Sequence, residues 1–177
     1  RSKKEAQIMI KTKSRKEALE YISSKYEKIN NPNNKFIFDI ANFYKSSERY
    51  KQAIKYYSLI INTLENDSEI KAELLYRRGA SFERLKDFQN ADKDLQESLS
   101  IKTDDAYVLN YLAYSWLERD YKIEEAIKML EKAYKQENND PYIIDSIGWA
   151  YYLISDYVKA EKLMKRAVEL MPDDPIV

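Results

Sequence analysis

The chain has 177 residues, with 30 Lys or Arg against 30 Asp or Glu, so its formal net charge at pH 7 is zero. This balance argues against nucleic acid as the main ligand, because surfaces that bind nucleic acid carry an excess of positive charge. The absence of His and Cys excludes disulfides, Cys or His nucleophiles, Cys/His metal sites and histidine acid–base catalysis.

The expected helices form a series of hairpins along the chain. An all-α class is expected because the chain has only two Gly and four Pro residues, and both types disfavour helix interiors. Apolar residues at the i, i+3, i+4, i+7 spacing of amphipathic helices predict about five hairpins, in segments 1–33, 34–71, 72–105, 106–140 and 141–174. The first hairpin is degenerate, and residues 175–177 begin a further, truncated repeat.

The segment 1–33 is also the most basic part of the chain, with nine Lys or Arg against four Asp or Glu. The simplest interpretation is a solvated surface. The alternative is a docking patch for an acidic neighbour, formed by Lys3, Lys4, Lys11, Lys13, Arg15 and Lys16.

A short phrase that ends in alanine recurs in all five segments. Its alanines follow one another at steps of 35, 38, 35 and 34 residues, and they are Ala18, Ala53, Ala91, Ala126 and Ala160. A fixed period in this range indicates stacked supersecondary units. Small residues also recur in the helix before each phrase, at Ala41, Gly79, Ala113 and Gly148. Small side chains at these positions would let the two helices of a hairpin approach closely.

The segment 141–174 shows the hairpin most clearly. Pro141 can begin the first helix, because the N–H that proline lacks would have no helical partner there. Asp156 is the expected N-cap of the second helix, and Pro172 ends that helix. Ala160 should be buried where the two helices cross. Because no capping helix follows, we expect apolar side chains such as Ile143 and Leu163 to be exposed at this end.

These motifs resemble the tetratricopeptide repeat, a helical hairpin of about 34 residues. The best match is formed by Ile144, Ile147, Gly148 and Tyr151, followed by Ala160, Met164, Ala167 and Pro172. The resemblance implies a single α-α superhelix over residues 1–177, a right-handed solenoid of about five hairpins. Parts of the chain resemble longer proteobacterial repeat proteins, and Asp174-Pro175 repeats the Asp140-Pro141 opening. We therefore expect an excised or partly ordered piece of a larger protein.

Three features depart from the pattern of that family. Asn138 stands where the motif usually has proline, and Arg78 stands where an apolar residue is expected. Residues 64–71 make the second segment four residues longer than the period allows. The extra residues predict either a longer helix or a bulged loop.

In this family the first helix of each hairpin lines a concave face, so the resemblance also implies a binding surface. Its residues lie at i, i+3, i+7 and i+10 of these helices, and in segment 106–140 the stripe ends at Leu117. The candidate partner-binding residues are Phe38, Asn42, Tyr76, Tyr107, Asn110, Tyr114, Tyr142, Asp145, Trp149 and Tyr152. Aromatic rings beside amides suit an extended peptide, because the rings bury its side chains and the amides pair with its backbone. The alternative is that Tyr114, Trp149 and Tyr152 pack between repeats.

Some members of the family bind heat-shock chaperones through a clamp of Lys, Asn and Arg that holds a terminal carboxylate. The corresponding positions here carry Phe38, Asn42, Tyr76, Arg77, Ala80, Asn110 and Asp145. Asn42 fits the clamp, but the paired cations are missing, and Asp145 would repel a carboxylate. The sequence does not support that activity.

We therefore expect a non-catalytic scaffold that binds a peptide or partner segment in an aromatic groove, without cofactor, metal or nucleic acid. The alternative is a structural module that self-associates, weakly in this chain, within a larger multi-repeat protein. The only candidates for catalysis are acidic residues such as Asp87, Asp92 and Asp94, which alternate with lysines as on a solvated helix face. No apolar run reaches the roughly 20 residues that direct membrane insertion needs. The compartment is unknown, and the resemblance slightly favours the bacterial envelope or periplasm over the cytoplasm.

Overall fold

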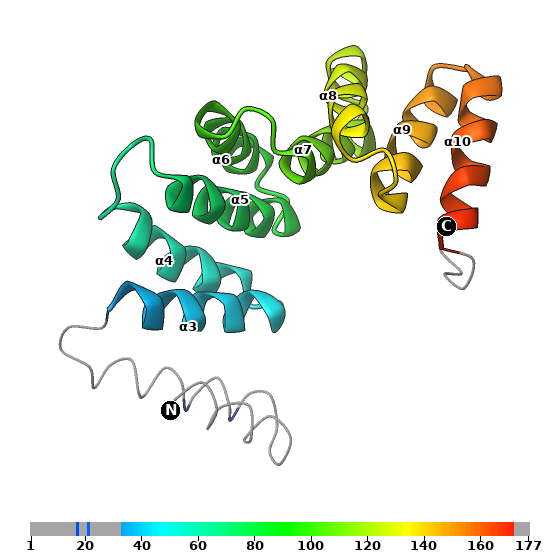
Figure 1. Ribbon diagram of the computed structural model, residues 1–177. Helices are drawn as coiled ribbons and strands as arrows, with labels where there is room; N and C mark the ends of the chain where they lie inside the picture. Colours follow the sequence, from blue (N-terminus) through cyan, green and yellow to red (C-terminus); the bar gives the residue numbers. More distant parts are fainter. Residues whose placement is uncertain (1–16, 18–20, 22–32, 172–177) are drawn as a thin grey trace. The chain divides into compact units, whose positions relative to one another are not determined.

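The computed structural model describes residues 17, 21 and 33–171 of the chain. In this described part, eight helices form four successive hairpins, each closed by a short turn (Figure 1). The hairpins are α3 (Asn34–Ser46) with α4 (Tyr50–Ile61), α5 (Glu69–Arg84) with α6 (Phe88–Ile101), α7 (Ala106–Glu118) with α8 (Ile123–Gln136), and α9 (Pro141–Leu153) with α10 (Tyr157–Leu170). The degenerate first hairpin, Ala18, the basic patch, Pro172 and the truncated repeat lie outside the described residues.

Side-chain caps explain where several of these helices begin. Asp140 precedes Pro141, and its Oδ1 accepts hydrogen bonds from the backbone N–H groups of Tyr142 at 2.9 Å and Ile143 at 3.2 Å. Asp156 caps α10 by accepting from the N–H of Lys159. Such caps satisfy N–H groups that have no partner within the helix. The expected roles of Pro141 and Asp156 are confirmed.

The turn inside each described hairpin contains a non-glycine residue in the left-handed region of backbone conformation. Their φ angles lie at 59°, 60°, 52°, 46° and 65° for Glu48, Lys86, Asp120, Lys122 and Ser155. This conformation is uncommon for residues with a Cβ atom. The four described hairpins thus close without glycine, which agrees with the low glycine content of the chain.

Contacts divide the chain into two compact units, Arg1–Asp94 and Leu95–Val177, which we describe separately as unit 1 and unit 2. In unit 1, α4 packs against both α3 and α5. In unit 2, α8 packs against α7 and α9, α10 packs against α9, and the two first helices α7 and α9 also contact each other. The single solenoid over residues 1–177 stays a prediction.

The recurrent small residues occupy the tightest positions between helices. Ala53, Ala91 and Ala126 are fully buried, and Ala160 is 2% exposed. A Cβ atom added to Gly148 would lie 3.2 Å from Cγ of Met164 and 3.4 Å from Cβ of Leu163. The predicted burial of Ala160 is confirmed, and α9 and α10 approach closely because Gly148 lacks a side chain.

The expected exposure of Ile143 is wrong, because its side chain is fully buried. It packs in a cluster with Ala106 and Leu109 of α7 and Ala133 of α8. The first helix of the last hairpin therefore turns this residue toward the preceding hairpin, whereas the exposed apolar side chains of α10 are Tyr157, Val158, Val168 and Leu170.

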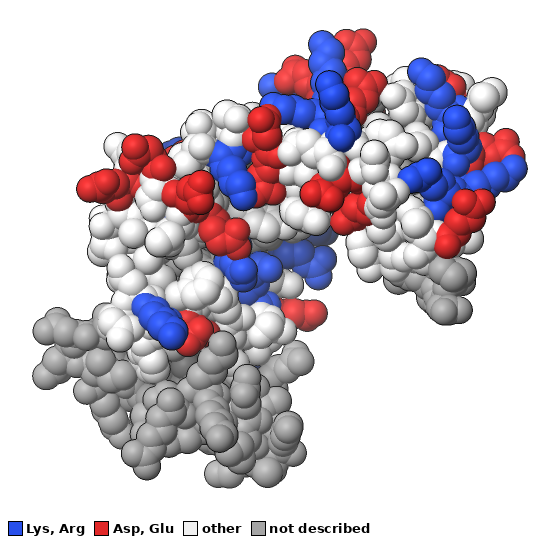
Figure 2. Space-filling view, in the orientation of Figure 1, with Lys and Arg blue, Asp and Glu red and all other residues white. Residues whose placement is uncertain are grey.

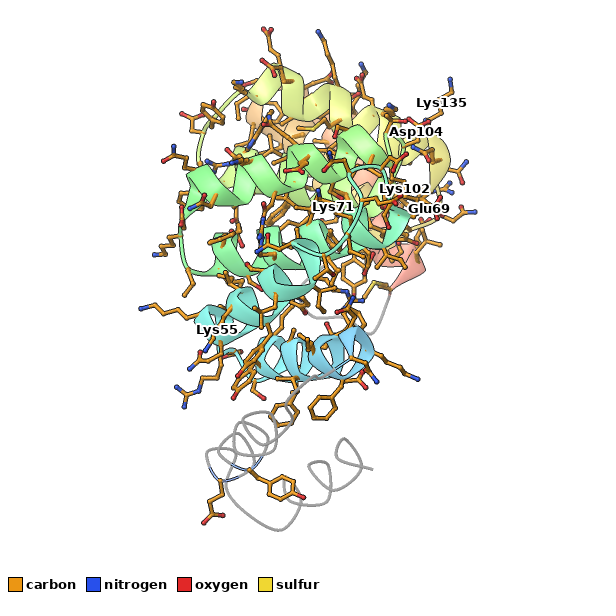
Figure 3. All side chains as sticks on the ribbon, turned by 90° about the vertical axis from the view of Figure 1, so that its left-hand side faces the viewer. Lys55, Glu69, Lys71, Lys102, Asp104 and Lys135 are labelled. Atoms are coloured by element: carbon orange, nitrogen blue, oxygen red, sulfur yellow. The ribbon has the colours of Figure 1, made fainter. Side chains whose placement is uncertain are left out.

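The four additional residues before the third segment are divided between a loop and a helix. The loop covers residues 62–68, and α5 has 16 residues where α3 has 13. Lys71, on the first turn of α5 (Figure 3), is buried, and its Nζ donates a hydrogen bond of 3.0 Å to Oδ1 of Asn66 in the loop. Part of the insertion therefore packs against the start of the longer helix.

Arg78 is accommodated at an apolar position because it has a buried partner in unit 1. Its Nε and Nη2 atoms lie 2.7 Å and 2.8 Å from the two carboxylate oxygens of Asp94, and Nη1 donates to Oγ of Ser58 at 3.0 Å. Asp94 is only 3% exposed. The interpretation of Asp94 as part of a solvated face is therefore wrong. Its bidentate pair with Arg78 is the geometry in which such hydrogen bonds are strongest.

Candidate partner-binding surface

The first helices of unit 2 carry almost no charge. α7 and α9 have 13 residues each, and each contains one charged side chain, Glu118 and Asp145 respectively. By contrast, Figure 2 shows Lys and Arg mixed with Asp and Glu over α8 and α10. A helix that is apolar on nearly all sides is typically buried or covered, yet parts of α7 and α9 are exposed.

Four large aromatic side chains account for much of this exposure. Tyr107 and Tyr114 on α7 are 54% and 40% exposed, and Tyr142 and Tyr152 on α9 are 61% and 54% exposed. Between them in sequence, Asn110, Asp145 and Trp149 are half-buried. These seven residues lie at the predicted i, i+3, i+7 and i+10 positions of their helices.

Leu117, the predicted end of the stripe on α7, is buried. The exposed position at this end belongs to Glu118, which follows Tyr114 by one helical turn. We call the resulting surface the α7–α9 face, and define it as Tyr107, Asn110, Tyr114, Glu118, Tyr142, Asp145, Trp149 and Tyr152. Sequence reasoning missed Glu118, although its i+4 spacing from Tyr114 placed it on the same side of the helix.

The rings of Tyr114 and Trp149 join the two helices. Their centroids lie 5.2 Å apart with an interplanar angle of 49°, within the range of favourable aromatic pairs. Farther along α9, the centroid of Tyr152 lies 5.4 Å from that of Tyr157 on α10. Tyr114 and Trp149 therefore pack between repeats, and Tyr114 remains partly exposed while it does so.

Both charges of the α7–α9 face act on Tyr114. Burial raises the pKa of the Tyr114 hydroxyl. The Glu118 carboxylate, which accepts a hydrogen bond from this hydroxyl, raises the pKa further, and so does the charge of the nearby Asp145. Burial also raises the pKa of Asp145. The hydroxyl of Tyr114 thus stays protonated and bound to Glu118.

Two polar groups of the face have no partner among the residues that the structure describes. Asp145 forms no hydrogen bond or ion pair there, although it is half-buried. The Oδ1 atom of Asn110 is buried and likewise has no hydrogen-bond donor. Buried acceptors without donors are energetically unfavourable. The face therefore combines exposed rings with one partly accessible acceptor without a partner, the Asp145 carboxylate.

The candidate residues of unit 1 lie in a different environment. Oδ1 of Asn42 on α3 accepts hydrogen bonds from the hydroxyl of Tyr57 and from Nη1 of Arg77, the latter at 3.1 Å. The guanidinium of Arg77 lies 5.3 Å from the ring centroid of Phe38, and its Nε donates to Glu73 at 2.7 Å. The stripe residues Phe38 and Asn42 of α3 are therefore already engaged in contacts within unit 1.

Burial shifts the pKa values of two side chains in unit 1, Tyr57 and Lys45. It raises the pKa of Tyr57 to about 12, and burial together with Arg77 lowers the pKa of Lys45. Tyr76 is half-buried, and Ala80 is buried. The contacts of Tyr57, Arg77 and Glu73 were not predicted from the sequence. The i, i+4 spacing of Glu73 and Arg77 indicates their ion pair, but no sequence pattern indicates the contacts of Tyr57 and Arg77 with Asn42.

Comparisons with known proteins identify the repeat. Residues 35–62 and 72–105 match the sequence profile of the tetratricopeptide repeat. Over 103 residues the chain is 33% identical to a TPR repeat-containing protein of Pseudomonas aeruginosa, a region that covers 58% of this chain and 18% of that protein. Residues 35–62 and 72–105 are therefore tetratricopeptide repeats, and the chain matches less than a fifth of the length of this relative.

Solved structures with low sequence identity share the fold. MamA from Desulfovibrio magneticus RS-1 is 18% identical, with a TM-score of 0.74 over 98% of this chain and 95% of that one. BtubC from P. vanneervenii is 19% identical, with a TM-score of 0.75 over 94% and 77%. YrrB, a TPR protein with an unusual peptide-binding site, is 18% identical, with a TM-score of 0.67 over 95% and 84%. The predicted all-α class of the α-α superhelix type is confirmed.

The described ranges, residues 17, 21 and 33–171, contain no candidate for a metal site or for a membrane-spanning helix. No group of three or more Asp or Glu side chains there could hold a metal ion. No helix in those ranges is both long and apolar enough to cross a membrane.

Proposed function

We propose that the α7–α9 face binds an extended segment of a partner protein. Proteins built from tetratricopeptide repeats are generally non-catalytic scaffolds for protein–protein interactions. The observation that carries the proposal is the exposure of four tyrosines on two helices with a single charge each. A partner segment would bury these rings and bring backbone donors to the half-buried Asp145.

Packing between repeats accounts for only part of this surface. It explains the contact of Trp149 with Tyr114, but Tyr107 and Tyr142 make no ring contact among the described residues and are more than half exposed. Exposed aromatic side chains on two helices that contact each other support an interaction site. The concave shape of the face, and its extension to Phe38, Asn42 and Tyr76, stay predictions.

The proposal is tested with pools of fluorescein-labelled nonapeptides of random sequence, and binding is measured by fluorescence anisotropy. Tyr142→Ala should weaken the binding of any pool that the wild-type protein retains, because the exposed ring contributes contact area. The unfolding transition should not move, because this ring packs against no other ring. Val158→Ala on α10, where Val158 is 83% exposed, is the control. Equal binding by all three proteins would contradict the proposal.

Self-association is the second candidate function, and the exposed apolar side chains of α10 favour it. Val158, Val168 and Leu170 lie on the last described helix with large exposed fractions. If they mediate self-association, sedimentation should show a mass that rises with concentration, and Val158→Lys should abolish this rise. A mass that is constant with concentration would contradict this candidate.

A location in the bacterial envelope is a further proposal, supported by the resemblance to proteobacterial repeat proteins. Fractionation of cells that express the complete reading frame would test it. Recovery in the cytoplasmic fraction alone would contradict it.

A further inference from the structure

We propose that the partner segment recognised by the α7–α9 face carries a Lys or Arg side chain, whose cationic group lies beside Asp145 and Glu118 and whose methylene groups lie on Tyr114 and Trp149. This inference rests on the proposed function and specifies the chemistry of the ligand. It is the opposite of a clamp for a terminal carboxylate.

The charge of the face favours a cation. The only charged residues of α7 and α9 are acidic, and both act on the same tyrosine, Tyr114. In the described part of unit 2, no Lys or Arg forms an ion pair with Asp145 or Glu118, although ion pairs join other acidic side chains of that unit to lysines. An acidic or C-terminal ligand group would be repelled there, whereas a cation would be attracted.

Burial strengthens this preference. Asp145 is half-buried without a donor, and Oδ1 of Asn110, one turn before Tyr114 on α7, is buried without one. A neutral apolar ligand would cover the half-buried Asp145 carboxylate and remove its remaining water, which is unfavourable. An ammonium or guanidinium group supplies several N–H donors and a compensating charge.

The aromatic rings suit the rest of such a side chain. Lys and Arg bury their methylene groups along apolar surfaces while the charged head group stays with polar partners, and cations are attracted to ring faces. This chain already forms such contacts. Nζ of Lys159 lies 5.1 Å from the ring centroid of Tyr151, and Nζ of Lys122 lies 5.3 Å from that of Trp116.

Unit 1 contains an internal version of the proposed contact. There, Arg77 lies against the ring of Phe38, donates to Asn42 and pairs with Glu73. In unit 2 the position that corresponds to Arg77 is Ser146, which is buried and whose hydroxyl donates to the carbonyl oxygen of Tyr142. Unit 2 thus lacks the cation that unit 1 supplies from its own chain, and we infer that the partner supplies it.

The test uses four pools of labelled nonapeptides that differ only at the central residue, which is Lys, Arg, norleucine or Glu. The wild-type protein should bind the Lys and Arg pools about tenfold more tightly than the norleucine pool, and the Glu pool most weakly. Asp145→Asn should reduce the Lys-to-norleucine ratio toward one. Glu161→Gln removes a carboxylate that pairs with Lys165 on α10 and should leave the ratio unchanged.

The outcomes separate the inference from the function on which it rests. If the Lys and norleucine pools bind equally and Trp149→Ala weakens both, the cation inference is overturned and the proposed function stands. If no pool binds, or if binding is insensitive to both Trp149→Ala and Tyr142→Ala, the proposed function fails as well. A Lys preference that survives Asp145→Asn places the cation elsewhere and also overturns the inference. Circular dichroism of each variant verifies that it is folded.

Discussion

Units 1 and 2 use the same helical stripe in different ways. In unit 1 the stripe residues Phe38 and Asn42 are engaged by Arg77 and Tyr57 of the same unit. In unit 2, Asn110 and Tyr114 occupy the corresponding positions of α7, and no basic side chain of the described residues pairs with the acidic groups beside them. The same backbone pattern therefore supports a closed polar network in unit 1 and an exposed aromatic face in unit 2. The two units differ at one position of the following hairpin's first helix, which carries Arg77 in α5 and Ser146 in α9.

The interior shows a second difference between the units. Position 78 of unit 1 carries an arginine that is paired with the buried Asp94. The corresponding positions in unit 2, Leu112 and Ile147, are buried aliphatic side chains. Unit 1 thus depends on a specific ion pair where unit 2 depends on apolar packing, and this contrast can be measured.

The largest effect is expected from Arg78→Leu. The substitution leaves the Asp94 carboxylate buried without its partner, and breaking such a pair lowers the free energy of unfolding by about 3 kcal/mol or more. Urea unfolding followed by circular dichroism measures the loss. The double variant Arg78→Leu/Asp94→Leu should recover much of it, since both charges are then removed. If Arg78→Leu is as stable as the wild type, unit 1 does not depend on the ion pair of Arg78 and Asp94, and this contrast between the units is contradicted.

The next largest effect concerns binding at unit 2. Trp149→Ala should weaken the best peptide pool by about 2 kcal/mol or more, because truncation of a central aromatic side chain removes desolvated contact area. Helical content should remain nearly unchanged. Lys35→Ala, on the stripe of α3 in unit 1, should have little effect. If Trp149→Ala unfolds unit 2 and residual affinity is unchanged, the tryptophan is a packing residue. The difference between the two units would then not reflect a binding site on unit 2.

Ala160→Leu tests packing that both units share. The larger side chain would overpack the crossing of α9 and α10, where Met164 and Leu163 already approach Gly148, at a cost of about 1–3 kcal/mol. The temperature of the unfolding transition measures the effect, and Ala53→Leu in unit 1 is the matched variant. A neutral effect of both substitutions would contradict the repeat register.

The smallest effect is a dependence of binding on pH. Burial raises the pKa of Asp145 above the ordinary value of 3.8, so folding favours the protonated form, and this group adds stability as pH falls through its pKa. A bound cation favours the charged form. Affinity for the Lys pool should therefore decrease as pH falls from neutrality through the raised pKa, whereas affinity for the norleucine pool should not.

Asp145→Asn is the control for this pH dependence, since an amide does not titrate in this range. The groups of α7 that act together with Asp145 are Tyr114, whose pKa is raised, and Glu118. A decrease that persists in Asp145→Asn would contradict its assignment to Asp145. Affinity for the Lys pool that is independent of pH would contradict the role of Asp145.

The sequence by itself determined the local features of this protein. The recurrent alanine phrase predicted the burial of Ala160, and Asp140-Pro141 and Asp156 predicted two helix starts that the structure confirms. The aromatic stripe of α7 and α9 was also visible as a pattern. These signals lie within one helix or one turn, where the spacing of 3.6 residues relates sequence directly to position.

The tertiary structure decided how these local features are satisfied. Ile143 is buried because α7 and α8 cover it, Arg78 is tolerated because Asp94 faces it from the next helix, and Asn42 is occupied by Arg77, 35 residues away in sequence. Helix periodicity predicts which side of a helix a residue occupies, but not which neighbour meets it there. Whether a polar side chain is paired or available depends on contacts between helices, and these form only when the hairpins pack together.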